Sequence, residues 1–419
     1  MFPLLLSSVV FAFVSAVSVP GKVSYDGYKV FRVAYGTESS KIDSLVSSLS
    51  LETWKSSAKA TGYVDVVVPP STLQDFELGT TDMETSIMHN DLGSSIAEEE
   101  SFQAYAAGAP NTTWFNSYHS YADHLTFLND LKNSFPSNSE IVTAGISVQG
   151  RAITGIHFWG SGGKGSQPAV VFHGTVHARE WVTTMVNEYF ADTLISGYAT
   201  NETLKAYVDK YDFYIFPVVN PDGFSYSQTN DRLWRKNRQT LSGNACRGRD
   251  INRNWPNAWD IPGGASTNPC AQDFKGRAGG DAPETQGLYG FVNKIQAAQG
   301  VKLFIDWHSY GQLFMTPYGY DCNKFAANNA ELQSLAGGAA RAIESVHGTA
   351  FEYGPICSTI YATTGSSVDY VQDVTKADYV FTAELRDKGT YGFVLPPRQI
   401  RDASEEAWAG VQYLLDNMD

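Results

Sequence analysis

The stretch from Val171 to Trp181, VFHGTVHAREW, runs from an apolar segment into three ionisable residues and then into a second apolar segment. The first segment, AVVFHG, is a short β-branched and aromatic run typical of a buried strand. The second segment shows the spacing of one helix face, at Val182, Met185, Val186, Tyr189 and Phe190. A strand followed directly by a helix predicts an α/β fold. It also places His177, Arg179 and Glu180 at the junction between the two elements.

Similar buried-strand candidates occur further along the chain. They are FYIFPVVN (213–220), KLFIDWHS (302–309) and YVFTAEL (379–385). His308 stands near the end of the second run and Glu384 near the end of the third. Helical periodicity is present in residues 121–135 and 404–418. Because ligands bind outside the carboxyl ends of strands in open α/β sheets, this pattern predicts a site at one sheet edge.

The bulk composition limits the possible classes of protein. The chain has 419 residues, of which 43% are hydrophobic and 18% charged, as in a globular protein with one large domain and a smaller one. Its formal net charge is −14. Nucleic acids and anionic membranes attract clustered Lys and Arg, so we expect neither as a partner.

The first residues indicate secretion. An apolar run from Leu4 to Val14 leads into the small residues 15–18, which predicts a cleaved signal peptide over residues 1–18 and no membrane segment in the mature form. The run is preceded by no Lys or Arg, so a single membrane anchor is the alternative. In a secreted chain, the sequons at Asn111 and Asn201 are expected glycosylation sites.

Residues 19–112 differ from the rest of the chain. Strand-like and helix-like segments follow one another in the order β-α-β-β-α-β, which predicts a small α+β domain of the ferredoxin-like type. We expect the acidic run Glu98–Glu100 and the stretch AYAAGAP (104–110) to form a connector. The alternative is an accessory domain that stays attached. Residues 113–419 alternate helix and strand, and we expect an α/β/α sandwich around a mixed, mostly parallel sheet.

His177, Glu180 and His308 are candidate metal ligands. A catalytic zinc ion usually has three protein ligands from His, Glu or Asp and keeps a fourth position open for water. The spacing H-x-x-E is by itself weak evidence for a metal site, because His and Glu often fall at this spacing by chance. A lone His at the end of a strand, such as His308, is also more often structural than a ligand. The four cysteines contain no C-x-x-C pair and favour disulfides, for which three pairings are possible.

Five further motifs give these candidates their context. They are RLWRKNR (232–238), DINRNW (250–255), DWHSYGQ (306–312), STIYATTGSSVDY (358–370) and FTAELRDKGTYGF (381–393). Together with HAREW, in this order and at this spacing, they make the chain resemble the zinc metallocarboxypeptidases of the pancreatic carboxypeptidase A type. The resemblance covers essentially everything after Thr113.

The resemblance implies one zinc ion per chain and a role for each matching residue. His177, Glu180 and His308 match the zinc ligands, and Glu384 matches the general base that deprotonates the attacking water. Arg235 matches the cation that stabilises the oxyanion. The residues that match substrate-binding positions are Asn252 and Arg253, which clamp the terminal carboxylate, the mobile Tyr361, and Arg179 and Tyr310 at neighbouring subsites.

The resemblance also implies an apolar specificity pocket. Val368 matches the residue on the pocket floor that sorts substrates, Ile356 and Met315 are expected in its wall, and Gly319 leaves room. A cationic side chain would lose its hydration there without gaining a partner. We therefore expect the enzyme to release Phe, Tyr, Trp, Leu or Ile. Thr363 is larger than the small residue often present at its position in the family, so the sequence leaves open how bulky a side chain the pocket accepts.

Further implications concern processing. Cys246 with Cys270, and Cys322 with Cys357, match disulfides of the family, the alternative being free buried thiols. The segment 19–112 resembles the inhibitory pro-domain, which an activating protease removes. Pancreatic zymogens are cut after a basic residue, yet no Lys or Arg occurs between Lys59 and Lys132. An activating protease of different preference is therefore expected.

The expected product is a secreted, extracellular monomer that acts on peptide or protein C-termini. Two other classes of protein remain as alternatives. A binding or inhibitory homologue without turnover would usually lack a ligand or the base, and all of these residues are present. A serine hydrolase would need a G-x-S-x-G motif, which the sequence lacks.

Overall fold

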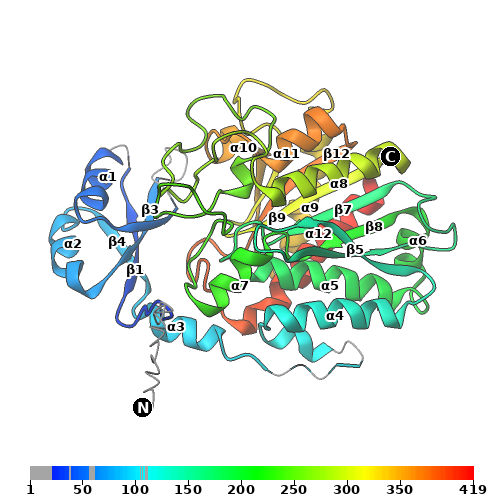
Figure 1. Ribbon diagram of the computed structural model, residues 1–419, viewed down its shortest axis with the longest axis horizontal. Coiled ribbons are helices and arrows are strands. Elements are labelled where there is room, and N and C mark those ends of the chain that lie inside the picture. Colours follow the sequence, from blue (N-terminus) through cyan, green and yellow to red (C-terminus); the bar gives the residue numbers. More distant parts are fainter. Residues whose placement is uncertain (1–20, 37–38, 56–61, 104, 106, 109–111) are drawn as a thin grey trace, which may run out of the picture.

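The computed structural model describes residues 21–419 except 37–38, 56–61, 104, 106 and 109–111 (Figure 1). The predicted signal peptide and the sequon residue Asn111 lie outside these residues. Among the described residues, no helix combines the length and the apolar character needed to cross a membrane. We call residues 21–100 the N-terminal unit and residues 113–419 the C-terminal unit.

The N-terminal unit has the predicted order of elements and forms a four-stranded sheet with strand order β2-β3-β1-β4. Neighbouring strands in it are antiparallel. Its elements are β1 (Lys29–Ala34), α1 (Ser39–Ser48), β2 (Glu52–Lys55), β3 (Tyr63–Val68), α2 (Leu73–Gly79), β4 (Glu84–His89) and α3 (Leu92–Glu99).

The two faces of this sheet have different partners. On one face, Val33 and Val66 pack against Ile42 of α1 and Phe76 of α2. On the other face, Val30, Val67 and Trp54 join a cluster that includes Tyr310 and Phe393 of the C-terminal unit. The sheet is therefore an open-faced sandwich whose open face packs on the C-terminal unit.

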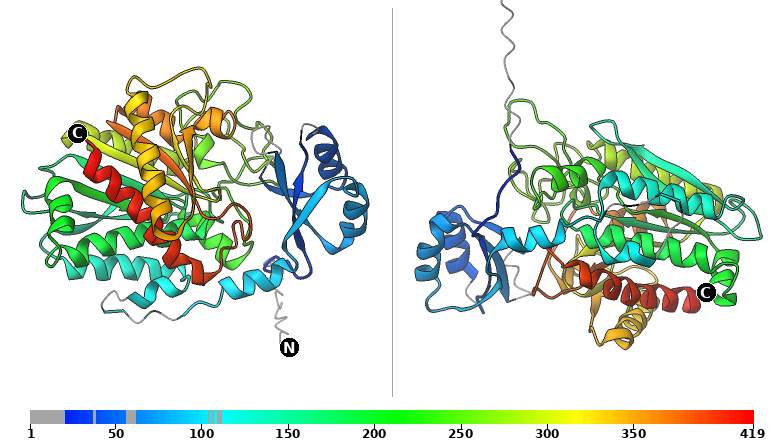
Figure 2. Two further views of the ribbon diagram at one scale, coloured as in Figure 1. Left: turned by 180° about the vertical axis from the view of Figure 1, so that it is seen from behind. Right: turned by 90° about the horizontal axis from the view of Figure 1, so that it is seen from below.

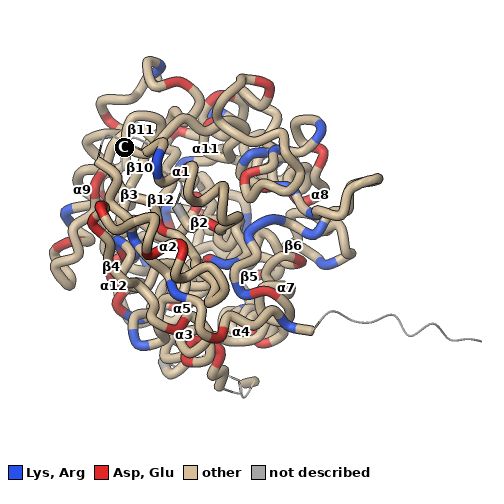
Figure 3. The backbone as a smooth tube through the Cα atoms, turned by 90° about the vertical axis from the view of Figure 1, so that its left-hand side faces the viewer, with Lys and Arg blue, Asp and Glu red and all other residues tan. Residues whose placement is uncertain are grey.

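The prediction of a connector at Glu98–Glu100 is wrong for its first part. Glu98 and Glu99 belong to helix α3, and Leu92, Ile96 and Glu99 are its buried residues. These positions lie on one helix face at i, i+4 and i+7 spacing. Glu99 is buried, and its carboxylate pairs with Arg232 of the C-terminal unit. The acidic run that the sequence predicts to be exposed to solvent therefore includes a buried ion pair. Figure 3 shows the acidic residues of α2 and α3 from the side of the N-terminal unit.

The C-terminal unit contains an eight-stranded sheet with strand order β11-β10-β12-β9-β7-β8-β6-β5. The central strands β12, β9, β7 and β8 are parallel, whereas β5, β6 and β10 join the sheet antiparallel. The prediction of a mixed, mostly parallel sheet is thus confirmed. The strands are β5 (Ser139–Ile146), β6 (Ala152–Phe158), β7 (Ala169–Gly174), β8 (Asp212–Phe216), β9 (Val301–Ser309), β10 (Leu313–Thr316), β11 (Glu352–Pro355) and β12 (Tyr379–Leu385).

Helices cover both faces of this sheet, as Figure 2 shows from two further directions. One hydrophobic core unites α4, α5, α6, α9 and α12 with one face of the sheet, and a second core unites α8 and α11 with the other. The helices are α4 (Tyr121–Ser134), α5 (Trp181–Gly197), α6 (Glu202–Lys210), α7 (Pro221–Thr229), α8 (Pro283–Gln299), α9 (Asn329–His347), α10 (Ile356–Thr359), α11 (Ser367–Tyr370) and α12 (Ile400–Asn417).

Candidate metal centre and substrate cleft

The junction between β7 and α5 presents His177 and Glu180. The strand ends at Gly174, and Glu180 is the residue that precedes the first turn of α5. The loop between them is held by Thr175, whose backbone N–H donates to the Thr183 hydroxyl at 2.9 Å. His308 comes from the end of β9, the strand beside β7. Two adjacent parallel strands therefore deliver all three side chains to the carboxyl edge of the sheet.

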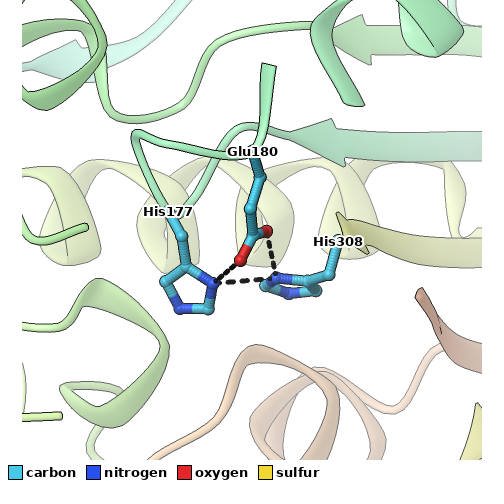
Figure 4. Close-up of side chains that lie close together, drawn as sticks. All are labelled: His177, Glu180 and His308. Atoms are coloured by element: carbon cyan, nitrogen blue, oxygen red, sulfur yellow. Dashed lines mark hydrogen bonds and ion pairs between the residues drawn. The ribbon is translucent and has the colours of Figure 1, made fainter. Parts of the chain in front are cut away.

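The three side chains converge on one point (Figure 4). Nδ1 of His177 lies 2.7 Å from Oε1 of Glu180, and Nδ1 of His308 lies 3.1 Å from Oε2 of Glu180. The two Nδ1 atoms are 3.1 Å apart. One donor atom from each residue lies within 4.8 Å of the others, and all three residues are buried. Two imidazoles and one carboxylate with an open side are the donor set of a catalytic zinc site.

A carboxylate stands behind each imidazole. Nε2 of His177 lies 3.2 Å from Oδ1 of Asp250, and Nε2 of His308 lies 3.2 Å from Oδ2 of Asp306. Such a carboxylate accepts the ring proton of a ligating histidine, which leaves the other nitrogen free to bind metal and fixes the ring orientation. Both imidazoles are therefore held with Nδ1 directed to the common point.

Neighbouring charges shift the pKa values of the carboxylates at the site. Burial alone would raise the pKa of Glu180, but the neighbouring His177 and His308 lower it well below its ordinary value. Burial likewise opposes ionisation of Asp250, and Arg235 and His177 outweigh that effect, so its pKa is also lowered. Glu180 and Asp250 thus remain anionic, and the buried anions favour a cation at the common point.

Glu384 and Arg235 flank the three candidate ligands. Glu384 on β12 pairs in register with His308 on β9, so the two side chains lie on the same face of the sheet, and both line one cleft. The Arg235 guanidinium binds Oδ2 of Asp250 through Nε at 3.1 Å and through a terminal nitrogen at 2.7 Å. Burial lowers the pKa of Arg235, but Asp250 and Glu180 raise it above its ordinary value, so the group stays cationic.

A cleft opens from this point, and we call it the substrate cleft. It brings together most of the candidates identified from the sequence. Its lining residues are His177, Arg235, Asn252, Arg253, His308, Met315, Ile356, Ile360, Tyr361, Thr363, Ser366, Val368, Thr382 and Glu384. Asn252 joins the cleft to α11, because its side-chain oxygen accepts the Ser367 backbone N–H at 2.9 Å.

One part of the wall of the substrate cleft is apolar. Val368 is buried at the start of α11, and Met315 and Ile356 are buried beside it. Gly319 adjoins this wall, because a Cβ atom there would lie 2.2 Å from Oγ1 of Thr363 and 3.3 Å from a methyl carbon of Ile356. The glycine therefore permits the close approach of the Thr363 segment.

Arg179 and Tyr310 do not line the substrate cleft. Arg179 meets Glu52 of the N-terminal unit at 3.3 Å, and the Tyr310 hydroxyl donates to Asp65 of that unit at 2.5 Å. A second cavity, which we call the approach cavity, is lined by Ser50–Trp54 together with Arg179, Arg235, Arg253 and Tyr361. The N-terminal unit thus covers the approach to the metal centre.

The cysteines form two disulfides, Cys246–Cys270 and Cys322–Cys357, and among the described residues no cysteine is free. Asn201, the second predicted glycosylation site, is exposed and precedes helix α6, where its side-chain oxygen accepts the Thr203 and Leu204 backbone N–H groups.

Asp250 and Asp306 are the residues of the site that the sequence analysis missed. Asp306 stands two residues before His308 on the same strand, and side chains at that spacing share one face. Asp250 stands two residues before Asn252 in a quoted motif. The period-two spacing on β9 was therefore a usable signal for the first residue, whereas the contact of Asp250 with His177 spans 73 positions.

Comparison with known proteins agrees with the architecture. Residues 124–410 match the family model described as zinc carboxypeptidase, and residues 33–99 match the model described as carboxypeptidase activation peptide. A metallocarboxypeptidase A-like protein of Trichophyton verrucosum is 50% identical over 403 residues, which cover 94% of each chain. Carboxypeptidase A1 of Mus musculus is 36% identical over 411 residues, which cover 96% of each chain.

Solved structures show the same fold. Thrombin activatable fibrinolysis inhibitor aligns with a TM-score of 0.86 at 25% identity, over 93% of this chain and 98% of that chain. Carboxypeptidase A from Helicoverpa armigera aligns with a TM-score of 0.78 at 28% identity, over 93% and 97%.

The fold and the buried His-Glu-His group define a metallopeptidase. More specifically, the chain belongs to the zinc carboxypeptidase family. It is a metallocarboxypeptidase made as a zymogen, because it carries the family's activation peptide, an intramolecular inhibitor, in its N-terminal unit.

Proposed function

We propose that the protein is a secreted exopeptidase that releases single aromatic or aliphatic residues from peptide C-termini, with Glu384 as general base. One observation carries this proposal. A single cleft joins the His177–Glu180–His308 group and Glu384 to Arg253 and to the apolar wall around Val368.

The donor atoms of His177, Glu180 and His308 fit a zinc ion, since two nitrogens and a carboxylate oxygen are its preferred ligands. A zinc ion held by these residues would supply polarisation of the scissile carbonyl and would lower the pKa of water toward about 7. Asp250 and Asp306 hold the two imidazoles in the tautomer that can ligate.

Glu384 is proposed to move the proton. Its carboxylate stands next to His308 on the neighbouring strand, so it can accept a proton from the attacking water and pass it to the leaving amine. Arg235 is proposed to stabilise the oxyanion, because it is cationic and already oriented by Asp250. Such preorganised donors typically lower the barrier by about 3–4 kcal/mol.

Arg253 is proposed to select a free C-terminus. Its side chain is buried in the cleft, and a planar guanidinium binds a carboxylate through two parallel hydrogen bonds. Asn252 would share the carboxylate, and Tyr361, which is 41% exposed at the cleft, would close over the bound residue. An internal peptide segment offers no carboxylate there, which makes the enzyme an exopeptidase.

The proposal extends to processing and surroundings. We infer a signal peptide over residues 1–18, a pro-domain with connector over 19–112 and a catalytic domain over 113–419, with secretion as a monomer. The pairs Arg179–Glu52 and Tyr310–Asp65 support the view that the N-terminal unit blocks the subsites of these two residues. Substrate access then needs an activating protease.

The test uses the zinc-loaded, proteolytically activated enzyme and peptides that differ only in a C-terminal Phe or Arg. We expect rapid release of Phe that stops on zinc chelation and returns when zinc is restored. Chelator-sensitive release of Arg with little release of Phe would overturn the specificity, and no release of any C-terminal residue would overturn the activity.

A further inference from the structure

Two buried arginines differ from all the others in the described part of the chain. Six arginine side chains are buried there. Four have a carboxylate partner, in the pairs Arg179–Glu52, Arg232–Glu99, Arg249–Asp281 and Arg386–Glu406. Arg238 and Arg253 have no carboxylate within ion-pair distance among the described residues. Burying a charge without an opposite charge is unfavourable, so each position suggests an anion supplied from outside. For Arg253 that anion is the substrate carboxylate.

Arg238 is held between two aromatic rings. Its guanidinium carbon lies 3.5 Å from the centre of the Tyr226 ring and 4.2 Å from that of Trp234. The residue is only 9% exposed, and its Nε has no hydrogen-bond partner among the described residues. Burial lowers the pKa of Arg238, and so does Arg247. The rings cover the faces of the guanidinium, and its N–H groups lie along its edge, which is where an anion would bind.

Arg238 forms part of the wall of a separate cavity of about 480 Å³, which we call the basic cavity. This size is in the range of ligand-binding pockets. Lys236 and Arg247 also line it, and neither has a carboxylate within ion-pair distance in the described part of the chain. Burial lowers the pKa of Lys236 to about 8. Three such cations around one cavity stand out in a chain with a net charge of −14.

The basic cavity adjoins the approach cavity, and the approach cavity adjoins the substrate cleft. Cys270 and Gln272 line both the basic cavity and the approach cavity, which in turn shares Arg253 with the substrate cleft. A ligand that extends along this route has its other end at the metal centre. A peptide substrate has that shape, whereas a small anion would occupy only one of the three spaces.

The N-terminal unit already places a carboxylate at the junction of the two cavities. The side-chain amide of Gln272 donates to Oε1 of Glu52 at 3.1 Å. The backbone N–H of Val23 also donates to the carbonyl of Asn230, another lining residue, at 2.7 Å. Removal of the N-terminal unit frees both positions, while the residues that line the basic cavity all belong to the C-terminal unit.

We propose that the basic cavity is a subsite for an acidic side chain of the peptide substrate, located several residues N-terminal to the scissile bond. In this assignment the Asp or Glu carboxylate binds the edge of Arg238, and Lys236 and Arg247 add attraction. The proposal rests on the proposed function and deepens it, because it makes peptides with an upstream acidic residue the favoured substrates.

The test uses the zinc-loaded, activated enzyme and a series of ten-residue peptides that end in Phe. In each peptide one Glu replaces Gln at a single position from the third to the eighth residue before the C-terminus. We expect kcat/KM for Phe release to be about five- to tenfold higher for Glu than for Gln at one or two adjacent positions, and this ratio to fall as salt increases.

Variants connect the effect to the cavity. Arg238→Gln should bring the Glu-to-Gln ratio close to one at every position. Arg247→Gln should reduce the ratio in part. Because Arg247 is exposed, this variant should fold normally and so tests the cavity even if Arg238→Gln, at a buried residue, does not fold. The matched control is Lys294→Gln on α8, which removes one exposed positive charge outside the cavity lining and should leave the ratio unchanged.

Each possible result either supports or excludes the subsite for an acidic side chain. A ratio near one at every position in the wild-type enzyme would overturn the subsite, while release of Phe from the same peptides would leave the proposed function standing. A preference that persists unchanged in both arginine variants would also overturn it. If sulfated polysaccharide binds the wild type but not Arg238→Gln, and no peptide preference exists, the cavity serves that polyanion instead.

Discussion

Glu99 and Arg232 form a completely buried ion pair that joins the N-terminal unit to the catalytic unit. Nε and one terminal nitrogen of Arg232 reach the two carboxylate oxygens at 2.6 and 2.8 Å. Arg232 also donates to the carbonyls of Arg179 and Phe393 and lies over the Trp181 ring. The arginine therefore belongs to the wall of the catalytic unit, and its only ion-pair partner in the described part of the chain comes from the segment to be removed.

We predict that Glu99→Gln loosens the zymogen. Removing one member of a buried ion pair typically weakens the structure by about 3–5 kcal/mol, because the other charge stays buried and unpaired. The uncut variant should show residual peptidase activity and unfold at lower denaturant concentration than the wild type. Glu98→Gln is the matched control, since Glu98 forms an exposed pair with Arg398 and such pairs contribute about 0–1 kcal/mol. Equal behaviour of the two variants would contradict the prediction.

Release of the N-terminal unit should depend on pH. Burial raises the pKa of Glu52 to about 7 in the zymogen, even though Arg179 opposes the shift and Asp231 adds to it. After separation Glu52 returns to its ordinary value near 4.5. At pH values between about 4.5 and about 7, the joined state binds more protons than the separated state. A rise in pH through this range therefore favours separation.

We therefore expect the cleaved N-terminal unit to inhibit more strongly at pH near 5 than at pH near 7.5, with a change of up to about tenfold per pH unit from Glu52. The measurement is peptidase activity of the cleaved, unseparated protein after dilution, as a function of pH. Glu52→Gln should flatten the profile, and Glu84→Gln, at an exposed residue on β4, is the control. A profile that stays the same in Glu52→Gln would exclude this carboxylate as a source of the dependence.

The elements that could be predicted from the sequence are those with a clear hydrophobic pattern within a short segment of the chain. The central strands β7, β8, β9 and β12 are buried on both faces, so each appears in the sequence as a continuous apolar run. The outer strands β5 and β6 alternate between buried and partly exposed residues and were not predicted. Helices α8 and α9 were also missed.

The candidate site shows the same division. His177 and Glu180 were found from their spacing, and His308 from its place near the end of a buried-strand candidate. The pair Glu99–Arg232 spans 133 positions, and the acidic run that contains Glu99 reads as a solvated connector. Only the docking of α3 on the catalytic unit buries it. Pairings over such distances depend on tertiary packing, which a single sequence does not display.

Asp250 should control metal affinity without being a ligand. Asp250→Asn leaves a group of the same size beside Nε2 of His177 and removes the charge that fixes its tautomer. We expect zinc affinity to fall about 10–100-fold, measured by competition with a chelator. Asp260→Asn, at an exposed residue, should not change it. Unchanged affinity in Asp250→Asn would show that the carboxylate is dispensable for the metal.

Glu384→Gln separates proton transfer from metal binding. The residue pairs in register with His308 but does not belong to the group of candidate ligands. We expect kcat to fall by about 10²–10⁴-fold, as is typical for loss of an acid-base group, while zinc content stays at one ion per chain. Loss of zinc would instead show that Glu384 helps to hold the metal, and retained turnover would remove it as the base.

Val368 should determine which C-terminal residues are released. The side chain is 1% exposed at the apolar end of the cleft, where an Arg or Lys substrate would lose hydration without a counter-charge. In Val368→Asp the introduced carboxylate supplies that counter-charge, so kcat/KM should fall about 100-fold for a peptide ending in Phe and rise by a similar factor for one ending in Arg. Val374→Asp makes the same substitution six residues further along at a side chain that is 49% exposed, and it should leave the preference for Phe intact. If both aspartate variants keep the wild-type order, the floor of the pocket lies elsewhere, and the assignment of aromatic and aliphatic substrates loses its structural basis.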